Sequence, residues 1–232
     1  TLYTMIDQKK SEEINLISLE DPVEYHMEGV CQVQINDRTD LTFANALRAV
    51  LRQDPDIIAV GEIRDGETAE IAMRAAMTGH LVFTTIHTND ALSSIDRLLD
   101  IGVEPYLIAG GVRGIISQRL VRKICPRCKQ AYTPSQEELE LLGLPQGDYQ
   151  FYRGTGCSEC FHTGYRGRTG VFEILTMTPD MRHAIHQKDR KAMEEAVRRS
   201  TFRPILEDCA HLVAEGITTT EEIVKVIGGQ VK

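Results

Sequence analysis

The chain has 232 residues, 42% of them apolar, and a formal net charge of −8 at pH 7. This length and apolar content suit one large domain or two smaller domains with real cores. No stretch approaches the roughly 18 apolar residues of a membrane span, and no segment has the layout of a signal peptide. The excess of acidic residues gives the chain no overall positive electrostatic field that would attract nucleic acid, whose binding proteins carry a basic face. Because Thr1 is not a start methionine, we expect a soluble, intracellular piece of a longer protein.

The first 105 residues alternate between strand and helix patterns. Apolar runs predict three strands, at residues 14–19, 57–60 and 81–86. Periodic or capped segments predict three helices, at residues 43–52, 65–79 and 90–102. Nearly continuous apolar strands between amphipathic helices are typical of a parallel sheet that is covered on both faces. The fold class predicted for this part is therefore α/β.

The remainder of the chain has a different pattern. From Pro105 a glycine-containing helix is predicted toward Lys123, followed by a cysteine-bearing segment with a capped helix up to Leu142. The stretch "GYRGRTGVFEIL" is expected to form a turn and a strand. Three helix starts then predict a mostly helical tail, at Thr178, Asp189 and Thr219. A basic run at residues 113–129 is interpreted as a solvated helix face beside a loop, with a partner surface as the alternative.

Four of the six cysteines form two Cys-x-x-Cys pairs, Cys125 with Cys128 and Cys157 with Cys160. Two intervening residues let a tight turn point both thiolates at one tetrahedral ion, so the pattern predicts a structural zinc site. Four thiolate ligands would leave no open position for chemistry. The alternative, two redox pairs or free thiols, lacks the surroundings of a thioredoxin-type site. The other two cysteines are expected to be buried small apolar residues, namely Cys31 and Cys209.

Polar clusters follow the three predicted strands, at residues 20–24, 61–65 and 87–90. Ligands of an open parallel sheet bind at the carboxyl ends of its strands, where loops diverge and helix N-termini point inward. Carboxylates gathered there suit metal binding and the orientation of a hydrolytic water. Each cluster alone could consist of helix caps or structural side chains. Their convergence favours a functional site.

Four segments, in order, resemble the motifs of one family: "ISLEDPVEY", "DPDIIAVGEIRD", "TGHLVFTTIHTNDA" and the tetracysteine segment ending "TGYRGRTGVFEIL". They are similar to the Asp box, Walker B segment, His box and zinc module of the secretion-superfamily traffic ATPases. Within that superfamily the likeness is to type II secretion and type IV pilus assembly ATPases. Pilus retraction ATPases and type IV secretion relatives generally lack the zinc module, so the resemblance implies an assembly motor.

The resemblance implies a fold and a role for each matched residue. It implies a RecA-like P-loop NTPase core at residues 1–122, a zinc module at 123–165 and a mostly helical subdomain at 166–232. Glu62 matches the Walker B glutamate, which acts through Mg²⁺ or its water shell, and Glu24 matches the activator of the attacking water. His80 and His87 match the His box, whose histidines sense the γ-phosphate and reach the neighbouring subunit. The implied nucleotide-binding residues are Glu20, Asp21 and Arg64. Arg64 is expected to brace the Walker B loop by pairing with a nearby acid.

The phosphate cradle of this family, G-x-x-x-x-G-K-[ST], does not occur in the 232 residues. "TLYTMIDQKK" resembles the helix that follows this loop, so the chain is expected to begin just after it. The loop amides, the lysine and the Mg²⁺-binding hydroxyl supply most of the charge stabilisation. We therefore expect this piece neither to bind ATP tightly nor to hydrolyse it, whereas its parent should do both.

The resemblance also implies the setting of the parent protein. It implies a bacterial homo-hexamer, cytoplasmic and peripheral at the inner face of the cell membrane, acting on an inner-membrane platform and on cytoplasmic docking proteins. No direct contact with nucleic acid is expected. Two alternatives are a zinc-stabilised protein-binding module without ATPase activity and a DNA-uptake or conjugation motor. The acidic balance counts against the second. The sequence does not separate type II secretion from pilus or competence systems.

Overall fold

The computed structural model describes residues 1–228, which form two compact units. The first unit comprises Thr1–Thr88, Leu92–Gly114 and Thr176–Ser200. The second comprises Asn89–Ala91, Ile115–Leu175 and the described residues from Thr201 onward. The chain therefore enters the second unit briefly at residues 89–91 before it does so for a long segment.

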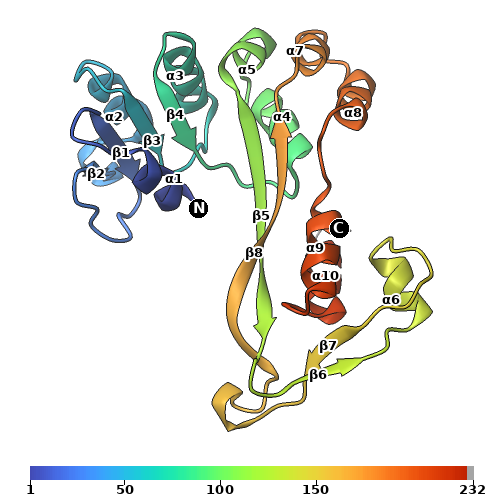
Figure 1. Ribbon diagram of the computed structural model, residues 1–232. Coiled ribbons are helices and arrows are strands. Elements are labelled where there is room, and N and C mark those ends of the chain that lie inside the picture. Colours follow the sequence, from blue (N-terminus) through green and yellow to red (C-terminus); the bar gives the residue numbers. More distant parts are fainter. Residues whose placement is uncertain (229–232) are drawn as a thin grey trace. The chain divides into compact units, whose positions relative to one another are not determined.

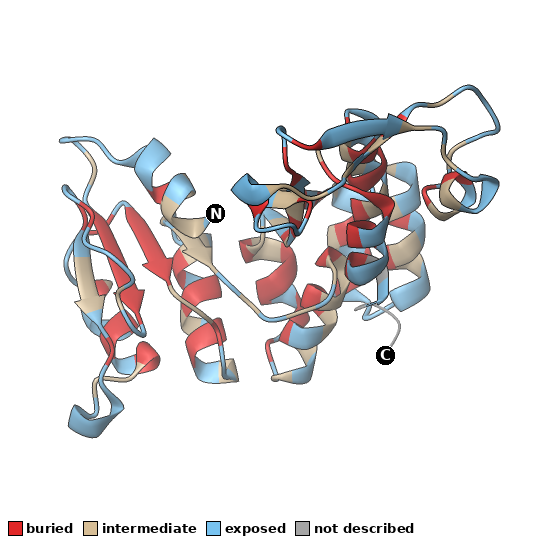
Figure 2. Cartoon of the chain, turned by 90° about the horizontal axis from the view of Figure 1, so that it is seen from below, coloured by how far each residue is buried: buried red, intermediate tan, exposed pale blue. Residues whose placement is uncertain are grey.

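A four-stranded parallel sheet organises the first unit (Figure 1). Its strand order is β2-β1-β3-β4, formed by Cys31–Gln34, Leu16–Glu20, Ile57–Val60 and Leu81–Thr84. The central strands β1 and β3 are buried along their whole length (Figure 2). This explains their continuous apolar runs, since both faces of a central parallel strand are covered. The predicted α/β class and parallel sheet are confirmed.

Helices precede and follow the strands along the chain, and several of them begin at a residue whose side chain caps the helix. The helices of the first unit are α1 (Leu2–Lys9), α2 (Phe43–Val50), α3 (Gly66–Met77), α4 (Ala91–Asp100), α5 (Pro105–Gly111), α7 (Pro179–His186) and α8 (Arg190–Arg199), with a 3-10 turn at Asp37–Thr39. The Asp65 carboxylate accepts a hydrogen bond from the Thr68 amide at 2.8 Å and so begins α3. The predicted helix starts at Thr178 and Asp189 are also observed as N-caps.

The second unit contains two antiparallel strand pairs and three helices. The long strands β5 (Gly114–Ile124) and β8 (Tyr165–Thr176) pair and run in opposite directions (Figure 1). The short strands β6 (Lys129–Tyr132) and β7 (Phe151–Gly154) form the second pair. The helical segments are α6 (Gln136–Leu141), the 3-10 turn Ser158–Cys160, α9 (Ile205–Ala214) and α10 (Thr220–Gly228). Residues from β5, β7, β8, α9 and α10 share one core, which includes the predicted buried residue Cys209.

Two predictions about local structure are wrong. The helix expected from Pro105 toward Lys123 ends at Gly111, and residues 114–124 form strand β5 instead. A side chain at Gly111 would come within 3.1 Å of the Met73 carbonyl oxygen, so this glycine serves the close packing of α5 on α3. The basic run therefore begins on a strand, because pairing with β8 overrides local helix propensity. Cys31 is exposed rather than buried, because it lies on the edge strand β2.

The sequences of several other elements only weakly indicate the structure that they adopt. Strands β2, β6 and β7 are four residues each and mix polar with apolar side chains, and α9 follows Pro204 without a side-chain cap. The three-part division of the chain at residues 122 and 165 stays a prediction. Helices α7 and α8 belong to the first compact unit, and α9 and α10 belong to the second.

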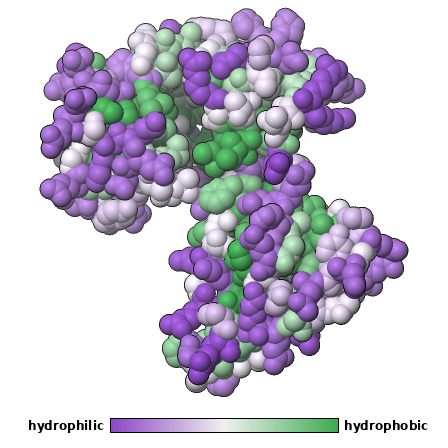
Figure 3. Space-filling view, in the orientation of Figure 1, coloured by the Kyte–Doolittle hydropathy of each residue, from purple (hydrophilic) through white to green (hydrophobic). Residues whose placement is uncertain are grey.

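One face of the molecule shows how polar and apolar side chains are distributed on its surface. On the face drawn in Figure 3, hydrophilic side chains cover most of the outer surface and apolar side chains form smaller groups. Within residues 1–228, no helix combines the length and the hydropathy that crossing a bilayer requires. Phe161 has the largest exposed fraction, 88%, among the large apolar side chains in this part of the chain.

A buried carboxylate with two cationic partners stabilises the second unit. Glu222 on α10 is 6% exposed and accepts hydrogen bonds from the Arg122 amide at 3.0 Å and from the Arg122 guanidinium at 2.7 Å. Lys225 donates to the same carboxylate at 2.6 Å. Burial raises the pKa of Glu222, but the hydrogen bonds from Arg122 and Lys225 outweigh it and lower the pKa to about 2. Glu222 is therefore ionised in the folded protein at any ordinary pH.

We expect Glu222→Gln to lower the free energy of unfolding by about 2 kcal/mol at pH 7, the usual scale for hydrogen bonds to a charged group. The pKa of Glu222 is lower in the folded state than in the unfolded state, so its contribution is present above about pH 5 and is lost as pH falls toward 2. The variant should therefore show a shallower pH dependence over that range in urea unfolding. The exposed Glu137→Gln removes the same charge as a control. Equal stability of both variants at pH 7 would contradict the prediction.

Candidate functional site

Three strand ends meet at one edge of the sheet. Leu19 of β1 pairs with Val60 of β3, and Val60 pairs in turn with Thr84 of β4. Because all three strands are parallel, the polar segments that follow them leave the sheet at the same edge. The structure therefore brings together the three clusters that the sequence singled out.

Glu62, Arg64, Asp21 and His87 form one connected group at this edge. Arg64 donates through Nε to Glu62 Oε1 at 2.6 Å and through Nη2 to Asp21 Oδ2 at 3.2 Å. The other Glu62 oxygen lies 3.2 Å from Nε2 of His87. Arg64 thus pairs with two acids, and its predicted role of bracing this loop stays a prediction. The contacts join all three clusters across β1, β3 and β4.

The electrostatics of the group keep Glu62 ionised. The hydrogen bond from Arg64 lowers the pKa of Glu62 below its ordinary value, against the effect of burial, and His87 lowers it further. A carboxylate with a low pKa is a weak general base, but it is well suited to holding a cation or a cation-bound water. Glu62 is therefore better suited to holding a metal ion or its bound water than to abstracting a proton.

Glu20 and Glu24 have different surroundings. Glu20 is buried, and its Oε1 accepts hydrogen bonds from Ser18 Oγ at 2.7 Å and Gln32 Nε2 at 3.0 Å. Its Oε2 accepts a hydrogen bond from the Tyr3 hydroxyl. The Glu24 amide donates to that same hydroxyl at 3.1 Å, while the Glu24 side chain is exposed. Glu20 therefore orders the loop through Tyr3, and Glu24 is the acid of this segment that is free to face a ligand.

The two histidines lie at opposite ends of β4. His87 follows the strand and is exposed beside Glu62. His80 precedes the strand, and its Nδ1 lies 3.0 Å from the Ala75 carbonyl oxygen and 3.3 Å from Thr78 Oγ1. Four strand residues span about 13 Å, so the structure does not bring His80 to the edge that holds Glu62. The predicted role of His80 stays a prediction.

Sequence reasoning missed two side chains near the site. A cavity of about 320 Å³ is lined by Glu62, Ile63, Arg64, Ile86, His87 and Arg97. Arg97 lies on α4, where nothing in the helix pattern marked it. Tyr3, which links Glu20 to Glu24, stacks on Tyr25 with ring centroids 4.5 Å apart. The cavity combines a carboxylate with two arginines, which suits a ligand that carries both anionic groups and a cation.

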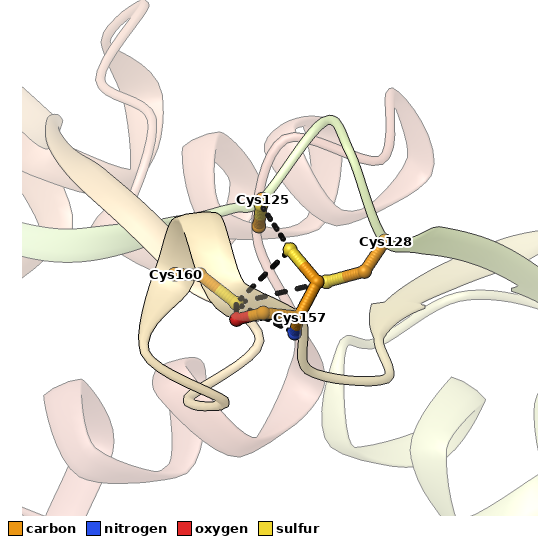
Figure 4. Close-up of side chains that lie close together, drawn as sticks. All are labelled: Cys125, Cys128, Cys157 and Cys160. Carbon is orange, nitrogen blue, oxygen red and sulfur yellow. Dashed lines mark hydrogen bonds between the residues drawn. The ribbon is translucent and has the colours of Figure 1, made fainter.

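The four predicted cysteines meet at one point (Figure 4). All four Sγ atoms lie within 4.8 Å of one another. Three of the Sγ–Sγ distances are 3.9 Å for Cys125–Cys157, 3.8 Å for Cys128–Cys160 and 3.7 Å for Cys157–Cys160. Sulfurs at the corners of a tetrahedron around Zn²⁺ are about 3.8 Å apart, whereas a disulfide is about 2.05 Å long. The arrangement therefore fits a tetrathiolate metal centre and excludes disulfides among these three pairs.

Backbone amides support the thiolate form of Cys160. Burial raises the pKa of Cys160, but the amides of Cys157 and Gly164 donate to its Sγ and lower the pKa to about 6. Burial raises the pKa of Cys128 to about 11. Gly164 has φ of 78°, and a side chain there would come within 2.6 Å of the Gly154 carbonyl oxygen. This close backbone approach brings the Gly164 amide to the cluster.

One family model matches nearly the whole chain. Residues 1–225 match the model of the family described as "Type II/IV secretion system protein". The chain belongs to this family. It is 45% identical, over 97% of its length, to the type II secretion system protein E of Pseudomonas aeruginosa, and 46% identical, over 96%, to the type IV pilus assembly ATPase PilB of Thermus thermophilus. It spans 45% of the first relative and 26% of the second.

Solved structures agree with this assignment. The pilus retraction motor PilT with bound ADP superposes with a TM-score of 0.70 at 30% identity, covering 97% of this chain and 56% of PilT. The Legionella pneumophila ATPase DotB gives a TM-score of 0.68 at 21% identity, covering 97% of this chain and 55% of DotB, which shows a shared fold. The predicted resemblance to secretion and pilus assembly ATPases is confirmed.

We expect the chain to bind one Zn²⁺ through the four thiolates. Cys128→Ser should lose most of the metal, as measured by elemental analysis of the purified protein, because an alcohol is a poor zinc ligand beside three thiolates. Stripping the metal with a chelator should accelerate amide hydrogen exchange in residues 125–160 first. The exposed Cys31→Ser is the matched control and should keep its metal. Full metal content in the Cys128 variant, or unchanged exchange after stripping, would contradict the prediction.

Proposed function

We propose that this chain is part of a motor ATPase that hydrolyses ATP with Mg²⁺ to power assembly of a type II secretion pseudopilus or a type IV pilus. The observation that carries the proposal is the contact of Glu62 with both Arg64 and His87 at the sheet edge where the Asp21 segment also ends. Family membership and the relatives named as ATPases support it. The site combines fixed acids, cations and a cavity, which phosphoryl transfer requires.

Each residue then has a role in the proposed reaction. Glu62 would hold Mg²⁺ or its water shell, since its pKa is lowered and its carboxylate is fixed by Arg64. Glu24, exposed on the neighbouring segment, activates the attacking water. His87 contacts the γ-phosphate, and His80 acts toward a neighbouring subunit from the other end of β4. Asp21 and Glu20 order the loop that presents Glu24.

The metal centre has a structural role in this proposal. Zn²⁺ held by the four thiolates would have a complete ligand set and no open position for a substrate. The ion would cross-link the two turns that carry the cysteines, where the cluster of buried residues consists of the cysteines alone. We propose that this stiff segment transmits force or docks a partner, such as an inner-membrane platform or a cytoplasmic docking protein. The working assembly is proposed to be a homo-hexamer, peripheral at the cytoplasmic face of the inner membrane.

The proposed reaction needs a loop that binds the phosphates of ATP. Arg64 and Arg97 line the cavity, but the 232 residues contain no G-x-x-x-x-G-K-[ST] segment. Backbone amides of such a loop provide most of the binding energy for the β- and γ-phosphates. We therefore propose that the chain alone binds nucleotide weakly.

Fluorescent-nucleotide titration tests this point. We expect this chain to bind at least a hundredfold more weakly than a version extended upstream through a phosphate-binding loop, because the loop amides and the lysine are then present. The matched comparison is the extended version with the loop lysine changed to alanine, which should fall toward the affinity of the short chain. Equal micromolar binding by the short and extended chains would refute the prediction.

A second experiment tests the role of Glu62 in the full-length protein. Glu62→Gln should lower kcat for ATP hydrolysis by about 10²- to 10³-fold while changing ATP affinity little, because it removes the charge that orders the metal and water but keeps the side-chain volume. Glu70→Gln, an exposed acid on α3 that pairs with Arg74, is the control and should hydrolyse ATP at the wild-type rate. If both variants turn over at the wild-type rate, the site is not an ATPase site, and a zinc-stabilised binding module becomes the better interpretation.

A further inference from the structure

Arg97 is a cation of the first unit that the proposed reaction does not use. It lies on α4, where Ile95 and Leu98 are buried and Arg97 itself is exposed. Residues three apart lie on one side of a helix, so packing of Ile95 and Leu98 fixes the rotation of α4 about its axis. Arg97 therefore leaves the helix at a defined point, beside the cavity that Glu62 and His87 also line.

The guanidinium of Arg97 has no partner within the first unit as the structure describes it. It forms no ion pair there with Asp100, although that acid lies three residues further along α4, the usual spacing for a pair on a helix. Asp96, the preceding residue, pairs with Arg190 of α8 instead. The acids nearest to Arg97 along α4 therefore leave its charge without a counter-charge.

The other arginine of the cavity is already engaged. Arg64 donates through Nε to Glu62 and through Nη2 to Asp21, so two carboxylates offset its positive charge. An anion that approached Arg64 would also approach these two carboxylates, which would repel it. Arg97 has free donors and no such acids bound to it, so it is better placed than Arg64 to receive an anionic group in the cavity.

We propose that Arg97 binds the terminal phosphoryl group of ATP from α4. The inference rests on the proposed function, which assigns Mg²⁺ or its water shell to Glu62 and the γ-phosphate to His87. Both residues line the same cavity of about 320 Å³ as Arg97, a size within the range of ligand pockets. The planar guanidinium matches the geometry of phosphate oxygens.

Such a contact would make α4 sensitive to the state of the nucleotide. ATP carries the terminal phosphoryl group and ADP does not, so Arg97 gains a partner with ATP alone. A ligand shifts a conformational equilibrium only through a difference in its interactions with the two states. The contact of Arg97 supplies such a difference between ATP and ADP on a helix that follows the His87 segment in the chain.

The test measures nucleotide affinity in the full-length protein, with Arg97→Met as the main variant. Methionine keeps much of the side-chain length but has neither the charge nor the donors. We expect a non-hydrolysable fluorescent ATP analogue to bind about ten- to hundredfold more weakly, because a hydrogen bond to a charged group has this strength. The affinity for a fluorescent ADP analogue should stay within about twofold of the wild type.

Arg198→Met is the matched control. It removes the same charge from an exposed position on α8, outside the residues that line the cavity. The ratio of ATP to ADP affinity should therefore stay at the wild-type value.

A second variant and a change of salt separate a phosphate contact from a structural role. Arg97→Lys keeps the charge but lacks the planar fork, so the ATP affinity should recover only in part. It also keeps the inference testable if Arg97→Met folds poorly. The ATP affinity of the wild type should fall more steeply with ionic strength than that of Arg97→Met, since salt screens the attraction between charges. A variant that only disturbed the packing of α4 would leave this salt dependence unchanged.

Two outcomes would overturn the inference and leave the proposed ATPase site standing. An unchanged ratio of ATP to ADP affinity in Arg97→Met would mean that Arg97 does not contact the terminal phosphoryl group. Equal weakening of ATP and ADP would mean that it acts on another part of the nucleotide or on the fold. In both cases Glu62→Gln should still lower kcat. If Glu62→Gln turns over at the wild-type rate, the proposed function fails, and the inference that rests on it fails too.

Discussion

The parallel register of β1, β3 and β4 is the constraint on which the candidate site depends. Pairing Leu19 with Val60 and Val60 with Thr84 places three loops at one edge. Arg64 can then bind Asp21 and Glu62 together, although these acids are 41 residues apart in the chain (21 to 62). Because a parallel sheet needs long crossover connections, the site is assembled from segments that are distant in sequence.

Three buried carboxylates are each stabilised in the same way, by several hydrogen-bond donors. Glu20 receives three side-chain hydrogen bonds, Glu173 receives two helix amides, and Glu222 receives donors from Arg122 and Lys225. A carboxylate can be buried only when its lost hydration is replaced by such donors. Each of these acids therefore specifies the position of the groups that surround it.

The cysteine cluster shows the same principle with sulfur. Four thiols gather where two tight turns face each other, and the amides of Cys157 and Gly164 point at one of the sulfurs. The cluster of buried residues at this point consists of the cysteines alone, so a metal held by the four thiolates would provide the cross-links between the two turns.

Local patterns in the sequence determined the parallel α/β core, the helix caps at Asp65, Thr178 and Asp189, and the four cysteines that cluster. These features depend on residues a few positions apart, and the motif order was sufficient to indicate the family. Only the tertiary structure decided that residues 114–124 form a strand, that His80 lies away from Glu62, that Arg97 lines the cavity beside Glu62, and that Tyr3 links Glu20 to Glu24. Those outcomes depend on which distant segments pack together, and no local periodicity or spacing encodes such contacts.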